Sequence, residues 1–334
     1  MPVPIVTVVV PTLAADDALA ACLRSLEAQT FEQFEVIVVD NSGERRVQAG
    51  GSRVRVIANP RNVGFGSAVN QAFRASESEF LATLNDDAVA DPRWLEALVA
   101  AAGASPGAGM FASEVRMAGC GTLDSAGMLI AADGSSKQRG HGQDAAKFAA
   151  MTEALLPSGS AALYRRKMLD EIGLFDELFF LYCEDTDLGL RARWAGWECG
   201  YVPGAIVEHR YSHSSGRASP LKAYYVERNR LYTAIKNLPF TMLARAPLMT
   251  LARYFWHVVL MIQGRGKAAE FRRAGFSASL LPFLVIRAHA SALFRMPRLM
   301  AERRRIRRQA RLSVPEFEQL LARYSISVRQ VAAL

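Results

Sequence analysis

Acidic side chains follow two apolar segments of the chain, at the positions where strands would end. Asp40 follows the run Val-Ile-Val-Val, and Asn85, Asp86 and Asp87 follow the run Phe-Leu-Ala-Thr-Leu. Oxygen ligands suit Mg²⁺ or Mn²⁺, and such ions commonly bind nucleotide phosphates. Carboxylates at the ends of strands lie at the edge of a sheet where ligands bind, and their oxygens could hold such an ion there.

A second acidic group, Glu184, Asp185 and Asp187, opens a segment with helical spacing. A carboxylate placed there could take a proton from a hydroxyl group, and Asp185 is the candidate general base for the inverting transfer that the resemblance described below implies. The alternative is structural, because acids in a first turn interact favourably with the helix dipole. Asp187 and Arg191 also have the i, i+4 spacing of a helical ion pair.

The elements that must position these side chains alternate between strands and helices. Runs rich in Val, Ile and Phe predict strands at residues 5–10, 34–40, 54–58 and 80–84. Helical spacing predicts helices at residues 17–29, 64–75 and 92–102. This alternation predicts an α/β fold with a mostly parallel sheet, and such sheets bind ligands at the carboxyl ends of their strands.

The remaining chain is less regular. Residues 103–142 are rich in glycine, and Asp133-Gly134 predicts a hairpin there. Ser158-Gly159-Ser160 is either an ordinary turn or a small-residue loop that leaves room for an incoming substrate.

Length and charge limit the class of protein. The 334 residues are 51% hydrophobic, which excludes a wholly disordered chain. Residues 207–334 carry 23 Lys and Arg against 6 Asp and Glu, whereas residues 1–206 carry 17 against 26. This asymmetry predicts two regions with different partners.

The four cysteines form no Cys-x-x-Cys pair, and we expect buried, reduced thiols. The N-terminus has no basic segment before its apolar run and predicts a first strand. Both patterns favour a catalytic region in the cytoplasm.

Several motifs taken in order resemble family 2 glycosyltransferases, which are inverting enzymes with the GT-A fold. They are Val-Val-Val-Pro-Thr at 8–12, Val-Val-Asp-Asn-Ser at 38–42, Asn-Pro-Arg-Asn-Val-Gly-Phe-Gly at 59–66, Leu-Asn-Asp-Asp at 84–87, and the segment 173–191 that ends in Glu-Asp-Thr-Asp-Leu-Gly-Leu-Arg. The resemblance covers about the first two-thirds of the chain.

The resemblance implies a role for each matching residue. Asp87 would bind Mg²⁺ or Mn²⁺ directly, and Asn85 departs from the Asp that many relatives carry. His209 would be a further metal or pyrophosphate contact, with His213 nearby. The implied donor-side residues are Thr12, Asp40, Asn62, Gly64, Asn70 and Asp86. The implied acceptor-side residues are Ser158, Gly159 and Glu184.

Several of these roles have structural alternatives. His209 would otherwise be a histidine whose hydrogen bonds are satisfied within the structure. Asp40 would otherwise form an Asx turn with Asn41 and Ser42. Asp86 and Asp87 would otherwise only open the turn before the next helix.

The C-terminal region predicts helices that lie on a membrane. Residues 240–264 and 274–296 are apolar but interrupted by Arg245, Arg253, Arg287 and Arg295, so no uncharged run spans a bilayer. We expect Arg303, Arg304, Arg305, Arg307 and Arg308 to face an anionic membrane. Apolar stretches beside this cluster favour lipid over nucleic acid, and helices that pack on each other or on a second copy are the alternative.

We therefore expect a GT-A catalytic domain at residues 1–215 and a helical, basic region at 216–334. The expected reaction is inverting, metal-dependent transfer of a sugar from a nucleotide-diphosphate donor, such as dTDP-rhamnose. The expected acceptor is a lipid-linked or cell-envelope glycan at the cytoplasmic face of the membrane. An inactive sugar-nucleotide-binding scaffold and a nucleotidyltransferase are the alternatives, and oligomeric state stays open.

Overall fold

The computed structural model describes residues 4–48, 53–210 and 218–334, which divide into two compact units. The first unit contains residues 4–128, 138–192 and 197–210. The second contains residues 129–137, 193–196 and 218–334. The predicted boundary at 215 lies outside the described residues, and the two short segments of the second unit were not predicted.

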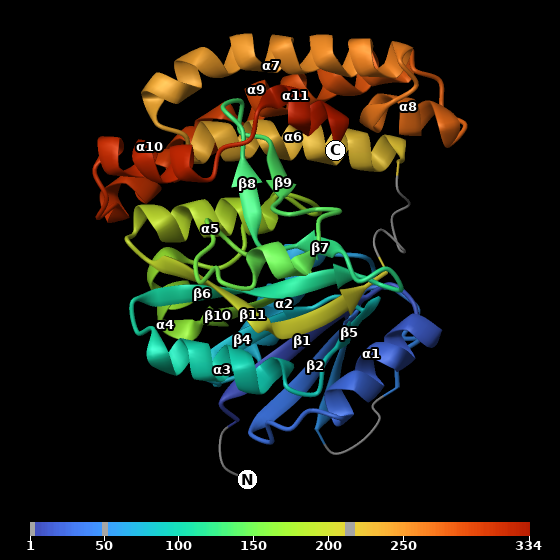
Figure 1. The fold of residues 1–334 in the computed structure, drawn as a ribbon, viewed down its shortest axis with the longest axis vertical. Helices are drawn as coiled ribbons and strands as arrows, with labels where there is room; N and C mark the ends of the chain where they lie inside the picture. Colours follow the sequence, from blue (N-terminus) through green and yellow to red (C-terminus); the bar gives the residue numbers. More distant parts are fainter. Residues whose placement is uncertain (1–3, 49–52, 211–217) are drawn as a thin grey trace. The chain divides into compact units, whose positions relative to one another are not determined.

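A mostly parallel sheet is the main element of the first unit (Figure 1). Four strands lie in the order β3, β2, β1, β4 and run parallel: β1 (Val6–Thr12), β2 (Phe34–Asp40), β3 (Val54–Ala58) and β4 (Phe80–Leu84). The sheet continues through β10 (Ala161–Arg165), β6 (Ala108–Met117), β11 (Glu198–His209) and β5 (Ala88–Ala90). β10 and β5 are antiparallel to their neighbours. The predicted fold class and all four predicted strands are confirmed.

The predicted helices are also present, with ends that shift by up to two residues. They are α1 (Asp17–Glu27), α2 (Phe65–Arg74) and α3 (Trp94–Ala104). Asp16 is the N-cap of α1, because its carboxylate accepts hydrogen bonds from the backbone N–H groups of Ala18 and Leu19. Two further helices, α4 (Arg166–Ile172) and α5 (Glu184–Trp194), follow β10.

The Gly-rich stretch contains the predicted hairpin, together with the ten-residue strand β6 and short strands that were not predicted. After β7 (Leu123–Ser125), β8 (Met128–Ile130) pairs with β9 (Ser136–Gln138). Gly134 lies in the turn with φ 84°, a conformation that favours glycine.

The long part of the second unit is helical. Its helices are α6 (Pro220–Asn237), α7 (Phe240–Ile262), α8 (Gly266–Arg273), α9 (Leu280–Gln309), α10 (Val314–Arg323) and α11 (Val328–Ala333). In the described part of the chain, no helix is long and apolar enough to cross a membrane.

Arg253 of α7 is buried and belongs to an ionic network. Its Nε is 2.7 Å from Asp133 Oδ2, and one Nη is 2.7 Å from Glu227 Oε2. Arg230 contacts the other oxygen of Glu227. Burial alone would raise the pKa of Glu227, but the two guanidinium groups hold it well below its usual value. The network therefore ties the hairpin segment of this unit to α6 and α7.

The expectation for the arginine cluster is wrong at Arg303 and Arg307. Arg303 donates to the carbonyl oxygens of Ile235 and Leu238, at 2.9 and 2.7 Å. Arg307 donates to the carbonyl oxygen of Leu238 at 3.1 Å and lies 3.5 Å from the ring centre of Trp194. Both arginines satisfy carbonyl groups at the C-terminal end of α6, where cations are favourable. They hold this unit together instead of facing lipid.

Candidate active site

The ends of β1 and β4 place a hydroxyl group beside a carboxylate. These strands are parallel neighbours, so their carboxyl ends meet at one edge of the sheet. Thr12 Oγ1 donates a hydrogen bond to Asp86 Oδ2 at 2.6 Å. Burial raises the pKa of Asp86, and the hydrogen bond from Thr12 opposes this. Two residues predicted on the donor side are therefore in direct contact.

Asp40, at the end of β2, is buried and shapes the loop that follows it. Its Oδ1 accepts a hydrogen bond from the N–H of Ser42 at 2.9 Å, and its Oδ2 accepts one from the N–H of Val47 at 3.0 Å. These are the contacts of the structural alternative, the Asx turn. A contact between Asp40 and a donor nucleotide stays a prediction.

Gly64 stands immediately before α2, where a side chain would not fit. Its φ is 89°, and a Cβ would lie 2.3 Å from the carbonyl oxygen of Phe180. The same oxygen accepts a hydrogen bond from the N–H of Phe65 at 2.9 Å. Asn62 Oδ1 accepts one from the N–H of Gly64 at 2.8 Å. The predicted donor-side loop therefore packs against the segment that leads to Asp185.

Asn70 has a positioning role in its described contacts. It is buried on α2, and its amide both donates to the carbonyl oxygen of Phe175 and accepts from the N–H of Phe175, at 2.9 and 3.1 Å. Its Nδ2 also lies 3.1 Å from Glu177 Oε1. Asn70 thus holds the loop after α4, and its predicted contact with the donor has no support in these contacts.

A cavity of about 540 Å³ adjoins the donor-side loop. It is lined by Arg61, Asn62, Val63, Ser67, Gln71, Arg74, Glu177 and Phe180. Among the predicted site residues in the described ranges, Asn62 alone lines it. This cavity therefore does not enclose Asp87 or Asp185.

Asp87 and His209 lie side by side, although 122 positions separate them in the chain. The pairing of β5 with β11 brings them together, and His209 Nε2 is 3.1 Å from Asp87 Oδ1. The other ring nitrogen, Nδ1, is 2.8 Å from Asp124 Oδ2. Burial alone would lower the pKa of His209, but Asp124 and Asp87 outweigh it and raise this pKa to about 9.

The donor set at this pair fits a divalent cation in part. An Asp carboxylate and a His nitrogen are both donors that Mn²⁺ accepts, and a His ligand commonly gives its other N–H to a carboxylate, as Asp124 allows. Among the described residues, no group of three or more His, Cys, Asp or Glu side chains could hold a metal ion.

Asp185 lies against the small-residue loop. Its Oδ2 accepts a hydrogen bond from the N–H of Gly159 at 2.9 Å, and a Cβ on Gly159 would lie 3.4 Å from the Cβ of Asp185. The carbonyl oxygen of Ser160 accepts a hydrogen bond from the N–H of Asn85 at 2.9 Å. The hydroxyl groups of Ser158 and Ser160 are hydrogen-bonded to each other at 3.0 Å. One short loop therefore connects the acidic motif after β4 with Asp185. Burial raises the pKa of Asp185 despite the backbone hydrogen bonds it accepts.

Glu184 is buried, and its Oε2 has no hydrogen-bond partner among the described residues. Burial, together with the neighbouring charge of Asp185, raises the pKa of Glu184 to about 8. The folded protein therefore keeps this carboxyl group protonated at neutral pH, unlike an exposed glutamate.

The pH dependence of stability tests this assignment. The folded state holds the Glu184 proton more tightly than the unfolded state, so the associated stability is present below the ordinary pKa of 4.5 and is lost as the pH rises through about 8. We expect Glu184→Gln to be more stable than the wild type at pH 8.5 by on the order of a few kcal/mol, and to differ less at pH 5. Thermal unfolding at both pH values measures this, with the exposed Glu32→Gln as control. A pH-independent difference would contradict it.

The loop before Glu184 is strained, which the sequence does not reveal. Phe180, Tyr182 and Cys183 have φ values of 65°, 70° and 64°, in the left-handed region that residues other than glycine seldom adopt. Each such residue costs on the order of 1–3 kcal/mol, and strain of this kind clusters at functional sites. The strained loop indicates that the position of Glu184 and Asp185 is imposed by the surrounding structure.

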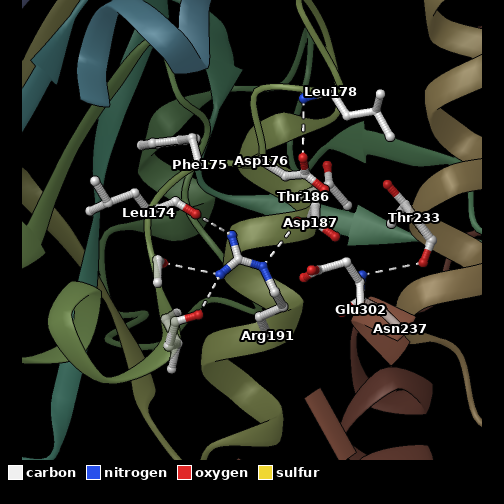
Figure 2. Close-up of polar contacts among 12 residues, drawn as sticks. Leu174, Phe175, Asp176, Leu178, Thr186, Asp187, Arg191, Thr233, Asn237 and Glu302 are labelled. Carbon is white, nitrogen blue, oxygen red and sulfur yellow. Dashed lines mark hydrogen bonds and ion pairs between the residues drawn. The ribbon is translucent and has the colours of Figure 1, made fainter. Parts of the chain in front are cut away.

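Arg191 is the residue that anchors the preceding loop (Figure 2). Its Nε is 2.9 Å from Asp187 Oδ2, as the i, i+4 spacing predicts. Its Nη atoms also donate to the carbonyl oxygens of Ile172, Gly173 and Leu174, at 2.9, 3.0 and 2.8 Å. Asp187 is therefore structural, and Arg191 joins α5 to the chain after α4.

Lysine cannot reproduce this set of contacts, because an ammonium group lacks the planar fork of guanidinium. We expect Arg191→Lys to lower the free energy of unfolding by about 2–4 kcal/mol, since buried carbonyl groups lose donors. Urea unfolding measures this. Arg74→Lys is the control, because the Arg74–Glu177 pair is exposed and should change stability by less than about 1 kcal/mol. Equal losses in the two variants would rule out the anchoring role.

Sequence reasoning missed Asp124, which lies in the irregular Gly-rich stretch and has no motif around it. His213, which the sequence places near His209, lies outside the described residues. The expectation of buried thiols holds for Cys22 and Cys199 but is wrong for Cys120, which is exposed.

Solved structures share this fold. A mannosyltransferase, PcManGT from Pyrobaculum calidifontis in complex with GDP-Man and Mn²⁺, is 16% identical with a TM-score of 0.53, over 91% of this chain and 85% of that chain. The S. aureus TarS 1–349 structure with UDP-GlcNAc is 17% identical with a TM-score of 0.53, over 96% and 91%. At this identity the similarity shows the GT-A-like fold alone.

Sequence relatives are more informative. An N-acetylglucosaminyl-diphospho-decaprenol L-rhamnosyltransferase of Mycobacterium tuberculosis is 32% identical over 250 residues, 66% of this chain and 81% of the relative. The rhamnosyltransferase WbbL of Escherichia coli K12 is 39% identical over 67 residues, 20% of this chain and 25% of the relative. Residues 2–234 match the family described as "Glycosyltransferase like family 2". The chain therefore belongs to glycosyltransferase family 2 and is a nucleotide-sugar-dependent glycosyltransferase.

Proposed function

We propose that this enzyme transfers rhamnose from dTDP-rhamnose, with inversion, to a hydroxyl group of a lipid-linked glycan. The observation that carries the proposal is the loop 158–160, which contacts both the acidic motif after β4 and Asp185. A donor held at the motif and an acceptor next to Asp185 would then react across a short distance. The names of the relatives from M. tuberculosis and E. coli support rhamnose, and the former supports a diphosphate-lipid acceptor.

Asp185 is the general base in this proposal. An inverting transfer needs a group that removes the proton of the acceptor hydroxyl while its oxygen attacks the sugar from the face opposite the leaving group. Burial raises the pKa of Asp185, which makes the ionised carboxylate a stronger base than an exposed aspartate. The N–H of Gly159 fixes one oxygen, so the carboxylate has a defined orientation.

Asp87 and His209 would hold the Mg²⁺ or Mn²⁺ ion, and Asp124 would orient the imidazole ring. When bound, the ion supplies Lewis-acid stabilisation of the charge that develops on the diphosphate leaving group. Thr12 holds Asp86 beside this site, where Asp86 would contact the ribose or the ion through water.

Features of the sequence argue against both alternative functions. A nucleotidyltransferase would ordinarily carry a Gly-rich loop with Lys or Arg after its first strand, and residues 11–17 have no such pattern. An inactive scaffold would bind the donor without needing a general base. This chain carries Asp185, a half-buried carboxylate at the position of the base.

A panel of nucleotide sugars, screened by thermal unfolding with Mn²⁺, tests the donor. At a hundredfold excess over its Kd, the true donor should stabilise the protein by on the order of 3 kcal/mol. We expect dTDP-rhamnose to raise the unfolding midpoint more than UDP-GlcNAc or GDP-mannose. A larger shift with another sugar nucleotide would reject rhamnose, and no shift with any of them would reject the site.

We also place the enzyme at the cytoplasmic face of the cell membrane, as a peripheral protein. The proposed acceptor is anchored in lipid, so the reacting hydroxyl group is within reach only near a bilayer. The excess of basic residues after residue 207 supports an anionic partner, and the apolar stretches among them favour a lipid surface over nucleic acid.

A further inference from the structure

Helix α7 has its apolar side chains on the outside. Leu248, Leu251, Phe255, Val258 and Ile262 are all at least half exposed, and Ile262 is 78% exposed. Their spacing of three and four residues places them on one face of the helix. We call these five residues the outer face of α7.

The opposite face of α7 carries polar residues that are buried. Thr250 and Arg253 lie there, and Arg253 is bonded to Asp133 and Glu227. In a helix on the surface of a protein in water, the apolar side normally faces the core. The buried face of α7 instead mixes Thr250 and Arg253 with Ala246 and Leu260, while the five larger apolar side chains of the outer face are exposed. This arrangement suits the outer face to a medium other than water.

The first half of α9 shows a similar pattern. Phe283, Ile286, Leu293 and Phe294 are 60–80% exposed, at positions that share one side of the helix. Leu284, Ala288 and Ala292 are buried on the other side and are smaller on average. Exposed apolar groups on this scale mark an interaction surface.

The charges around these residues identify the partner. Residues 240–298 contain nine Lys and Arg and a single acidic residue, Glu270. Exposed arginines stand in α7 and in the segment after it, at Arg245, Arg265, Arg272 and Arg273. A second copy of the chain, docked by this same face, would add an equal excess of cations to the interface and no acidic partners for them. Anionic lipid would neutralise them and also accept the apolar side chains.

We propose that the outer face of α7 and the exposed apolar residues of α9 enter the headgroup region of an anionic bilayer. The flanking arginines bind lipid phosphates, with their aliphatic parts along the apolar surface. This inference rests on the proposed membrane location and names the surface responsible for it. Neither helix crosses the bilayer, in agreement with their hydropathy.

Vesicle co-sedimentation tests the surface. The full-length protein should bind vesicles of phosphatidylcholine and phosphatidylglycerol in equal parts, and bind phosphatidylcholine alone more weakly. Binding should weaken but persist at 1 M salt, where the Debye length falls from about 10 Å at 0.1 M to about 3 Å. Replacing Arg245, Arg265, Arg272 and Arg273 by Gln should reduce the salt-sensitive part of the binding.

The double variant Leu251→Glu and Phe255→Glu should lower vesicle binding by at least about tenfold, because it puts charge into the apolar layer. Both positions are exposed, so unfolding midpoints should match the wild type. Met151→Glu, at an exposed apolar residue of the other unit, is the matched control and should bind normally. The assay requires no sugar transfer, so its outcome is independent of the proposed reaction.

Three results would overturn the proposal. The wild type could fail to co-sediment with anionic vesicles at low salt. The double variant could bind them as well as the wild type does. Finally, sedimentation equilibrium could show that the wild type is a stable dimer and the double variant a monomer. This result would assign the outer face of α7 to a second copy of the chain.

Discussion

Replacing Asp185 by asparagine should lower the rate of sugar transfer by about a hundredfold or more, the effect of removing a general base. Asparagine keeps the size of the side chain and an oxygen that can accept the hydrogen bond from Gly159. It cannot accept the proton of the acceptor hydroxyl. Donor binding should therefore stay close to that of the wild type, and the defect should appear in kcat.

The matched control is Asp170→Asn on α4, an exposed aspartate with no described role in the site. Its transfer rate should equal that of the wild type. Equal donor affinities, measured by calorimetry, would separate a lost base from a damaged site. Near wild-type turnover of the Asp185→Asn variant would remove Asp185 from the mechanism.

Removing the divalent cation with EDTA should abolish transfer, and added Mn²⁺ or Mg²⁺ should restore it. Asp87→Ala should weaken metal-dependent nucleotide binding more than Asp86→Ala, because Asp87 faces His209 while Asp86 is bonded to Thr12. The affinity for Mn²⁺ in the presence of nucleotide measures this difference.

Asp124→Asn extends the test to the residue behind His209. Loss of a carboxylate that orients a histidine ligand typically lowers metal affinity by about 10–100-fold. Asp144→Asn, exposed in the same stretch of chain, is the control. Full activity in excess EDTA would reject the roles in metal binding that we assign to Asp87, His209 and Asp124.

The fold could be predicted because its pattern is local. β1, β2 and β4 are apolar runs whose residues are almost all buried, so hydrophobicity alone marks them. β3, at the end of this strand order, is only partly buried. Asp86 and Asp87 follow β4 directly, so the direction of that strand places them at the edge of the sheet. The glycine at position 64 was part of a motif, and its positive φ explains why glycine is needed there.

The features that the sequence did not predict depend on contacts between distant parts of the chain. Asp124 meets His209 only because β6 pairs with both β7 and β11. The strain at residues 180–183 is a property of the backbone and leaves no signal in residue type. The arginines of α9 show the same limit, because a run of like charges predicts a solvated surface. Arg303 instead meets the carbonyl groups at the end of α6, which no local pattern encodes.

The most direct test of the central claim is the configuration of the product. The purified enzyme is incubated with Mn²⁺, dTDP-rhamnose and a short-chain N-acetylglucosaminyl diphosphate lipid, and the product is examined by proton NMR. We expect a disaccharide lipid whose new linkage has the anomeric configuration opposite to that of the donor, formed by the wild type and not by Asp185→Asn. A product that retains the donor configuration, or one formed equally well by the Asp185→Asn variant, would contradict the account.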